Sequence, residues 1–520
     1  MMDTRIVVGK PWWWLAGIVV VYLVLAIAMD RTFMPWCDEA WFATPGLNLV
    51  QHGSFGTPVL DETSVWNQRN LHGVNRITYW FMPLHPLVVA GWSLIAGPNL
   101  MAVRTLSMLW GLLALAAWYV AVRALAAPDG TRAAVFMVGL LTIDFQFQWS
   151  AGQGRMDMMA EAFLACAFAS YLVWRETNFT RAVLVSQTFM TLAGLTHPIS
   201  LGGFVGLLFL TLYLDWRKVR PKHIALAAIP YVIGGVAFGV FVSQDPVLFR
   251  DQFYGNMTGR FSRSVGFLQA LWAQYNERFL WNYGLAPDTR GLSHLKIVIL
   301  ATYLGGMAAA WAIRDFRARR EYRAWMVTCF VLFVCYSAIN MDGHEFYLIH
   351  FLSPAIAILA LVLDWVIRTR LVRSWVVAAV IFVLVSIQLM TIVSRIRQDA
   401  YRTRYLDMTA FVKSHARPGD LIMGSSELGW ELGFWGNNVV DDFRLGYLTG
   451  KHPDIIVLDK NRYQEWIPNL KVFNPKAYEF TTGLLAREFE PVHRNESYIV
   501  YLRKDRVGAA AVSPANHQVR

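Results

Sequence analysis

The sequence has 520 residues, of which 56% are hydrophobic and 16% charged, and its mean hydropathy is +0.36. Soluble globular chains are nearer a quarter charged, so this composition excludes an ordinary soluble protein and indicates a chain solvated mostly by lipid. The net charge of +11 does not indicate nucleic-acid binding, because the basic residues cluster in short loops between apolar segments, as the positive-inside rule predicts. The four cysteines imply no disulfide framework.

Apolar segments alternate with polar loops through the first 399 residues, and a spanning helix needs about 20 mostly apolar residues. Eleven spans are predicted at residues 11–29, 104–122, 133–149, 158–174, 182–196, 199–215, 223–243, 295–313, 324–340, 347–366 and 374–394. The arginine-rich loops then share a side with the N-terminus, which is therefore predicted to be cytoplasmic. The membrane is the plasma or inner membrane of the cell.

Residues 79–97 are apolar enough to cross as well, but Pro83, His85 and Pro86 interrupt their first half. If this segment crosses, every later loop changes side and the arginine-rich loops fall outside. An interfacial or re-entrant segment keeps them inside, and we prefer that interpretation.

The chain divides into three parts. Residues 1–399 form the membrane domain, with a first external loop at about 30–103. Residues 400–506 alternate short β patterns with helical stretches, which predicts a small extracytoplasmic α/β domain. Residues 507–520 have the composition of a disordered tail. The predicted fold class is therefore a mainly α, polytopic helical bundle with a small C-terminal α/β domain.

Two acidic residues, Asp38 and Glu39, follow the first span directly. A pair of carboxylates where a membrane helix ends can supply a general base or a metal ligand. The alternative is helix capping, since acidic residues are favoured in the first turn of a following helix.

A second acidic pair, Asp157 and Glu161, opens a predicted span on the same side of the membrane and shares one helix face. Carboxylates in membrane-embedded segments are costly, so they usually have a partner or a function. Arg155 is a candidate partner for them. The alternative is an ion pair that holds helix ends together.

Histidines recur on this external side, at His85, His197 and His344, and Tyr347 follows the last of them by three residues. Each one alone is more typical of an interfacial hydrogen-bonding residue. No rule of topology forces histidines and carboxylates onto the same face, so their shared side predicts a reaction centre there.

The motifs that contain these residues form an ordered set over about residues 11–395. The set comprises Asp38-Glu39, His85-Pro86-Leu87, Gly97-Pro98-Asn99 with Arg104 and Leu106, Gly154-Arg155-x-Asp157, Gly194-Leu195-Thr196-His197-Pro198, and His344-Glu345-x-Tyr347 with Pro354. In order and spacing it resembles the GT-C glycosyltransferases of the protein O-mannosyltransferase and lipid A aminoarabinose-transferase group. Each motif is short, so the specificity lies in their order.

The resemblance implies a transferase that uses a polyprenyl-phosphate sugar and acts outside the cytoplasm. Because the sequence offers no obvious second nucleophile, a single displacement with inversion is expected. Asp38 is then the base that deprotonates a hydroxyl acceptor on a lipid, glycan or protein, with Glu39 in support and Asp157 at the second acidic position. Arg104, Arg155, His85, Glu161, His197, His344 and Tyr347 are the candidate substrate-binding residues. Aminoarabinose transferases carry Glu-Lys-Pro-Pro where this sequence has Pro83-Leu84-His85-Pro86, so their sugar is not carried over and a requirement for a divalent cation is left open.

Two other functions are compatible with this pattern. A transporter or flippase of lipid-linked sugars is also polytopic, but it usually places ionisable groups near the midplane and is often built of two related halves. A ligase of similar fold moves a whole glycan at once. Glycosyl transfer explains the one-sided carboxylates best.

Overall fold

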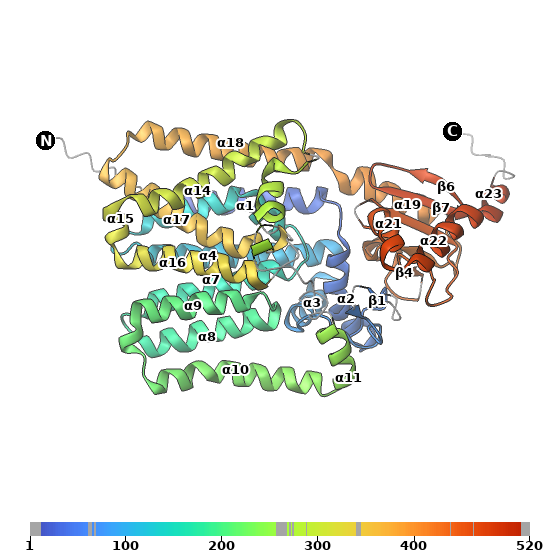
Figure 1. The fold of residues 1–520 in the computed structure, drawn as a ribbon, viewed down its shortest axis with the longest axis horizontal. Helices are drawn as coiled ribbons and strands as arrows, with labels where there is room; N and C mark the ends of the chain where they lie inside the picture. The colour runs from blue at the N-terminus through green and yellow to red at the C-terminus, as the bar shows by residue number, and fades with distance from the viewer. Residues whose placement is uncertain are drawn as a thin grey trace.

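The computed structural model describes residues 12–60, 71–255, 268–269, 272, 275–287, 289–339, 345–436, 438–460 and 462–510, and the backbone of 65–66 and 69–70. Most of them are helical, and the helices run side by side in an elongated bundle with a separate C-terminal domain at one end (Figure 1). His344 lies outside the described residues, so the structure gives no position for that predicted binding residue.

Seven helical stretches of the described residues are long and apolar enough to cross a membrane. They are Trp12–Thr32 (α1), Leu100–Leu125 (α4), Asp157–Trp174 (α7), Pro221–Val242 (α10), Gly291–Ala312 (ending in α14, Ile297–Ala312), Phe346–Thr369 (containing α17, Ile349–Thr369) and Ser374–His415 (beginning with α18, Ser374–Gln398). Helices α8 (Phe179–Thr196), α9 (Ser200–Asp215) and α16 (Arg320–Ile339) lie alongside them (Figure 1). The predicted count of eleven crossings stays a prediction.

The predicted span at 133–149 is not one continuous helix. It consists of α5 (Thr131–Ile143) and α6 (Phe145–Ala151), and the chain breaks at Asp144. The Asp144 carboxylate accepts hydrogen bonds from the backbone N–H groups of Gln146 and Phe147, at 3.0 and 2.9 Å, and so caps α6. A buried cap of this kind ends one helix and starts the next without leaving backbone donors unsatisfied.

Small residues let the helices approach closely. On α9, a Cβ at Gly202 would lie 2.7 Å from the Tyr336 ring of α16, and one at Gly206 would lie 2.5 Å from Leu332 of the same helix. Close packing of this kind, with glycines four residues apart, is typical of helix pairs in membranes. Helix α7, with its run of alanines, is buried along nearly its whole length between α4 and α8.

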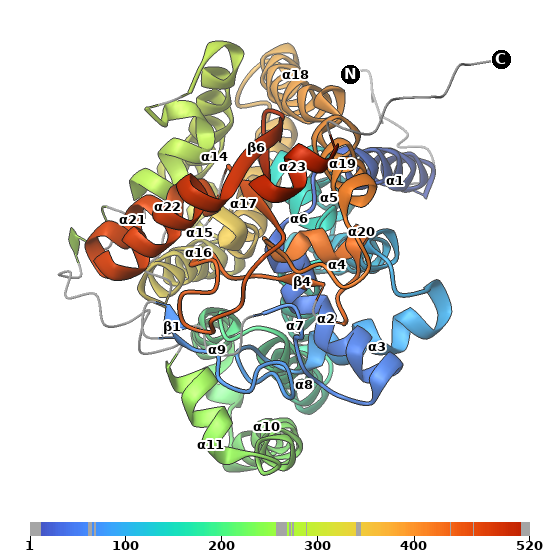
Figure 2. The ribbon, with the colours of Figure 1, turned by 90° about the vertical axis from the view of Figure 1, so that its right-hand side faces the viewer.

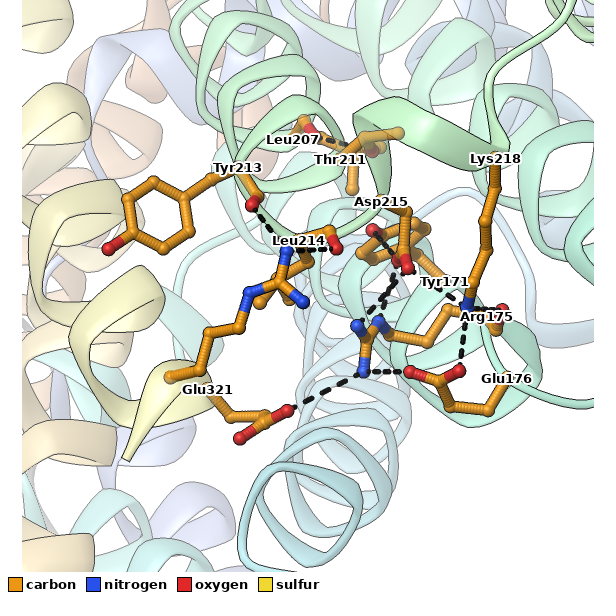
Figure 3. A network of polar contacts seen from close by, with 11 residues as sticks. Tyr171, Arg175, Glu176, Leu207, Thr211, Tyr213, Leu214, Asp215, Lys218 and Glu321 are labelled. Carbon is orange, nitrogen blue, oxygen red and sulfur yellow. Dashed lines mark hydrogen bonds and ion pairs between the residues drawn. The ribbon is translucent and has the colours of Figure 1, made fainter. Parts of the chain in front are cut away.

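A polar network joins α7 to α9 (Figure 3). It lies by the turn between α9 and α10, at the end of the bundle away from the C-terminal domain (Figure 1). The Asp215 carboxylate, 2% exposed, accepts hydrogen bonds from Tyr171 at 2.6 Å and from Arg175 at 2.7 and 3.2 Å. Nζ of Lys218 lies 3.0 Å from Oδ1 of the same carboxylate. The network satisfies both carboxylate oxygens and ties the ends of the two helices together.

The two ends of the bundle differ in sequence. The arginine-bearing turn between α9 and α10 and the short α15 (Arg314–Ala318) lie at one end, and the C-terminal domain lies at the other (Figure 1). Helices α2 (Cys37–His52) and α3 (Leu84–Ala96) are also at the C-terminal-domain end (Figure 2). With 13 residues, α3 is shorter than the roughly 20 that a crossing needs.

The C-terminal domain is built on a five-stranded sheet in the order β4-β3-β5-β7-β6. Three strands run parallel: β3 (Ile422–Gly424), β4 (Val439–Val440) and β5 (Ile455–Asp459). Strand β7 (Tyr498–Arg503) pairs antiparallel with β5 on one side and with β6 (Phe489–Arg494) on the other. Helices α19 (Asp407–His415), α20 (Gly429–Leu432), α21 (Tyr463–Phe473) and α22 (Pro475–Glu488) accompany the sheet. The last described helix, α23 (Lys504–Ala510), extends four residues beyond the predicted domain boundary.

Candidate active site

The first turn of α2 sends its two carboxylates in different directions. Asp38 forms an ion pair with Arg155, and its side chain is 18% exposed. Glu39 is fully buried and accepts a hydrogen bond from the backbone N–H of Trp36 at 2.9 Å, which caps the helix. The helix N-terminus favours both negative charges. Of the two, Asp38 is the carboxylate that a substrate can reach.

Glu39 pairs with Arg104 of α4 in a fully buried, two-pronged contact, with N–O distances of 2.8 and 2.9 Å. Arg104 also donates to the backbone carbonyls of Asp30 and Phe33, and the N–H of Gly154 donates to Glu39 at 2.8 Å. The protein itself thus engages every nitrogen of the Arg104 guanidinium. The supporting-base role of Glu39 and the substrate-binding role of Arg104 stay predictions, and in this structure both side chains are engaged by the protein's own groups.

Gly154 lets this contact form directly beside Arg155. A Cβ at position 154 would lie 2.6 Å from the Val103 side chain and 3.5 Å from Glu39. The close approach explains why a glycine precedes the arginine at this point of the chain.

Arg155 lies between two carboxylates and two aromatic rings. Besides its ion pair with Asp38, its Nε donates to Asp157 at 2.8 Å. The guanidinium carbon lies 3.9 Å from the centroid of the Phe346 ring and 5.2 Å from that of Phe42. At 3% exposure this cation is held in one orientation, with its planar face on an aromatic ring.

Asp157, at the start of α7, connects this centre to His197. The backbone N–H of Ile199 donates to Nδ1 of His197 at 3.0 Å, so a neutral ring carries its proton on Nε2. That nitrogen lies 3.9 Å from Oδ1 of Asp157. The Tyr347 ring packs edge-on against His197 with centroids 5.2 Å apart. His85, buried at the start of α3, lies within electrostatic reach of Asp157.

Glu161 lies one turn deeper and does not join the centre. It is fully buried, accepts a hydrogen bond from Trp118 at 2.9 Å and contacts Nδ1 of His350 at 3.0 Å. These contacts lie within the bundle and favour a structural role over the predicted substrate-binding one.

The structure therefore brings together Asp38, Arg155, Asp157, His197 and Tyr347, while Glu39, Arg104 and Glu161 lie beside this group in buried pairs of their own. The rings of Phe42 and Phe346 were missed by the sequence analysis. An aromatic residue near a membrane interface is too common to stand out in a sequence.

A metal site was left open by the sequence. In the described ranges no three His, Cys, Asp or Glu side chains lie close enough to hold a metal ion together. The two carboxylates of the centre, Asp38 and Asp157, are paired with Arg155.

No protein-family model matches the chain, and no curated protein sequence matches it. Among solved structures it is similar to ArnT from Cupriavidus metallidurans in the apo state, with a TM-score of 0.58 and 16% identity over 98% of this chain and 100% of that one. The same ArnT bound to undecaprenyl phosphate gives a TM-score of 0.57 and 16% identity, covering 95% of this chain and 98% of that one.

The chain has the GT-C fold. The oligosaccharyltransferase of Archaeoglobus fulgidus, in complex with zinc and sulfate, is also similar, with a TM-score of 0.52 and 11% identity over 93% of this chain and 73% of that one. The similarity and the seven apolar helices identify a multi-pass membrane protein of the GT-C fold, as predicted from the sequence.

Proposed function

We propose that this GT-C protein is a glycosyltransferase that moves a sugar from a polyprenyl-phosphate donor to a hydroxyl acceptor on the extracytoplasmic face of the cell membrane. The observation that carries the proposal is the centre at the start of α2. There a partly exposed carboxylate, Asp38, is held by a buried arginine, Arg155, between aromatic rings. A carboxylate that is partly exposed and oriented by a neighbouring cation is placed to accept a proton from an acceptor hydroxyl.

In the proposed reaction Asp38 takes the proton of the acceptor hydroxyl group. The hydroxyl oxygen of the acceptor attacks the anomeric carbon of the donor sugar at the same time. The bond between that carbon and the phosphate oxygen breaks, and its electron pair leaves with the polyprenyl phosphate. The departing group is an anion, so a cation is enough to stabilise it. Arg155 provides that charge within the same centre, and one displacement inverts the anomeric configuration.

Asp157 and His197 have supporting roles in this scheme. Asp157 fixes the guanidinium of Arg155 from the side opposite Asp38. His197, with its proton on Nε2, faces Asp157 and offers that carboxylate a second electrostatic partner. His85 and Tyr347 border this group and are proposed to contact the donor sugar or phosphate.

Two structural neighbours support the choice of donor. The ArnT neighbour was solved with undecaprenyl phosphate, and the archaeal neighbour is an oligosaccharyltransferase. For this chain we propose a lipid-linked sugar as donor and an envelope lipid, glycan or protein as acceptor. The C-terminal domain lies at the same end of the bundle as Asp38, so we place it on the extracytoplasmic side too (Figure 1).

The proposal is tested with the purified protein in lipid nanodiscs, a panel of labelled polyprenyl-phosphate sugars and crude membrane acceptors. The readout is the release of polyprenyl phosphate by wild type and by Asp38→Asn. Release that falls by about 10²–10⁴-fold in the variant supports glycosyl transfer with Asp38 as base. Sugar-lipid that crosses the bilayer without release of polyprenyl phosphate replaces the proposal with a transporter.

A further inference from the structure

Helix α2 has a second face, one that the reaction scheme does not use. Its residues Cys37 and Trp41 are buried, while Asp38 points to Arg155. Cys37 and Trp41 are four residues apart and so share one side of the helix. This side is covered by the C-terminal domain.

Trp41 is held by two residues of the C-terminal domain. Its indole Nε1–H donates to Oγ of Ser426 at 2.6 Å. The guanidinium of Arg462 lies over the same ring, 4.6 Å from its centroid, with the Trp466 ring also 4.6 Å away. An indole held by a hydrogen bond at its edge and by a cation on its face is fixed in both position and tilt.

Asp441 holds the residues that contact Trp41. One carboxylate oxygen lies 2.6 Å from Nη1 of Arg462 and accepts from the backbone N–H and the hydroxyl of Ser426, at 3.0 and 2.5 Å. The other accepts from Tyr463 at 2.9 Å. Arg462 also donates to Ser425 at 3.0 Å.

These residues come from the carboxyl ends of the parallel strands. Ser425 follows β3, Asp441 follows β4, and Arg462 follows β5 by three residues. Carboxyl ends of parallel strands meet at one edge of a sheet, where α/β domains usually bind ligands. Here that edge receives the Trp41 side chain of the membrane domain instead.

Cys37 connects this contact to Asp38. Its thiol lies 3.7 Å from Oδ1 of Asp38 on one side and within electrostatic reach of Arg462 on the other. A second contact fixes the far end of α2, where the indole of Trp435 donates to Asn48 at 2.8 Å. The C-terminal domain therefore holds α2 at both ends.

We propose that Arg462 and Asp441 of the C-terminal domain are positioning residues for Asp38, acting through the clamped Trp41 side chain. Asp38 reaches Arg155 only if α2 keeps its place and rotation on the bundle. The Glu39–Arg104 pair provides part of that constraint within the bundle, and the C-terminal domain adds to it on the other face of the helix. For its activity readout the inference rests on the proposed transferase function, but its structural readout does not.

The structural readout is alkylation of Cys37 by a maleimide, mapped by mass spectrometry on the full-length protein in nanodiscs. Cys37 is 3% exposed, and burial raises the pKa of its thiol well above the usual value, so wild type is expected to react slowly. Arg462→Met removes the cation from the Trp41 ring and leaves Asp441 without its arginine. We expect Cys37 labelling to rise about tenfold or more as the contact opens.

The kinetic readout separates positioning from binding. Since Arg155 is untouched, KM for the donor is expected to stay within about twofold while kcat falls by roughly 10²-fold, as for a misplaced reactive group. Trp41→Phe is the milder variant, because it keeps an aromatic ring of smaller size under Arg462 and removes the donor to Ser426. It is expected to lower kcat about fivefold, near the loss of one hydrogen bond.

Arg506→Lys is the matched control. Arg506 pairs with both oxygens of Asp420, at 2.9 and 2.8 Å, within the same domain. This change weakens the domain without touching Trp41, so both labelling and kcat are expected to stay at the wild-type level. Protected Cys37 and unchanged kcat in Arg462→Met would overturn the inference. If wild type releases no polyprenyl phosphate, the proposed function fails, and the labelling result still decides whether the clamp exists.

Discussion

Helix α7 has an arginine–aspartate site at each end, and the two sites differ in how completely they are satisfied. They are separated by 18 residues, or about 27 Å of helix. At the far end Asp215 is 2% exposed and has Arg175, Tyr171 and Lys218 as partners. At the near end Asp38 is 18% exposed and has Arg155 as its ion-pair partner. The same residue types join two helices in one place and form the proposed reaction centre in the other, and the two carboxylates differ in their exposure.

The buried support of the near end gives the largest expected effect. Arg104→Met leaves the fully buried carboxyl group of Glu39 without its arginine, which should cost roughly 3–5 kcal/mol of folding stability. Stability and polyprenyl-phosphate release should fall together, because Glu39 also holds Gly154 beside Arg155. Thermal unfolding in detergent measures the loss of stability. A variant as stable as wild type would show that this pair does not support the site.

The far end should respond in stability alone. Asp215→Asn keeps the shape of the side chain but removes the charge that Arg175 and Lys218 share, at a cost of roughly 3 kcal/mol. The unfolding temperature should fall, while release per folded molecule stays unchanged. Lower activity of the folded protein would mean that the two ends are coupled through α7.

The cation at the near end can be changed without removing its charge. Arg155→Lys loses the planar contact with Phe346 and the fork that spans Asp38 and Asp157. We expect release to fall about 30-fold, which corresponds to ~2 kcal/mol, with little loss of stability. Initial rates at saturating donor provide the measurement. Wild-type rates would rule out a role for the fork geometry.

Glu427 in the C-terminal domain lies close to another acidic residue, Asp459. Burial and the charge of nearby Asp459 raise the pKa of Glu427 above its ordinary value. The neutral form is therefore favoured on folding, so its stabilisation is complete below about pH 4 and is lost as the pH rises through the raised pKa. Glu427→Gln should flatten the decline of the unfolding temperature between about pH 5 and pH 9 by a small amount. An identical decline in the variant would contradict the assignment.

Much of the fold was predictable because its signals are local. Hydropathy located the apolar helices, and β patterns located β3, β5 and β7. Strand β4 has only two residues and β6 contains Pro491, so neither carries a strand pattern. The break at Asp144 depends on a cap whose partners become visible only in the structure.

The candidate site was predictable as a set of residues but not as a set of roles. The sequence singled out Asp38 and Glu39 together, yet only contacts across the fold distinguish them. Glu39 meets Arg104, 65 positions later, and Asp38 meets Arg155. The Arg462–Trp41 contact joins two domains and leaves no pattern within either segment.

The central claim is that an accessible carboxylate makes the near end reactive and a saturated one makes the far end structural. The most direct test compares polyprenyl-phosphate release per folded molecule for Asp38→Asn and Asp215→Asn in the same nanodiscs. The account predicts a loss of about 10²–10⁴-fold for Asp38→Asn and a wild-type rate for Asp215→Asn. Full activity in Asp38→Asn, or equal losses in both variants, would contradict it.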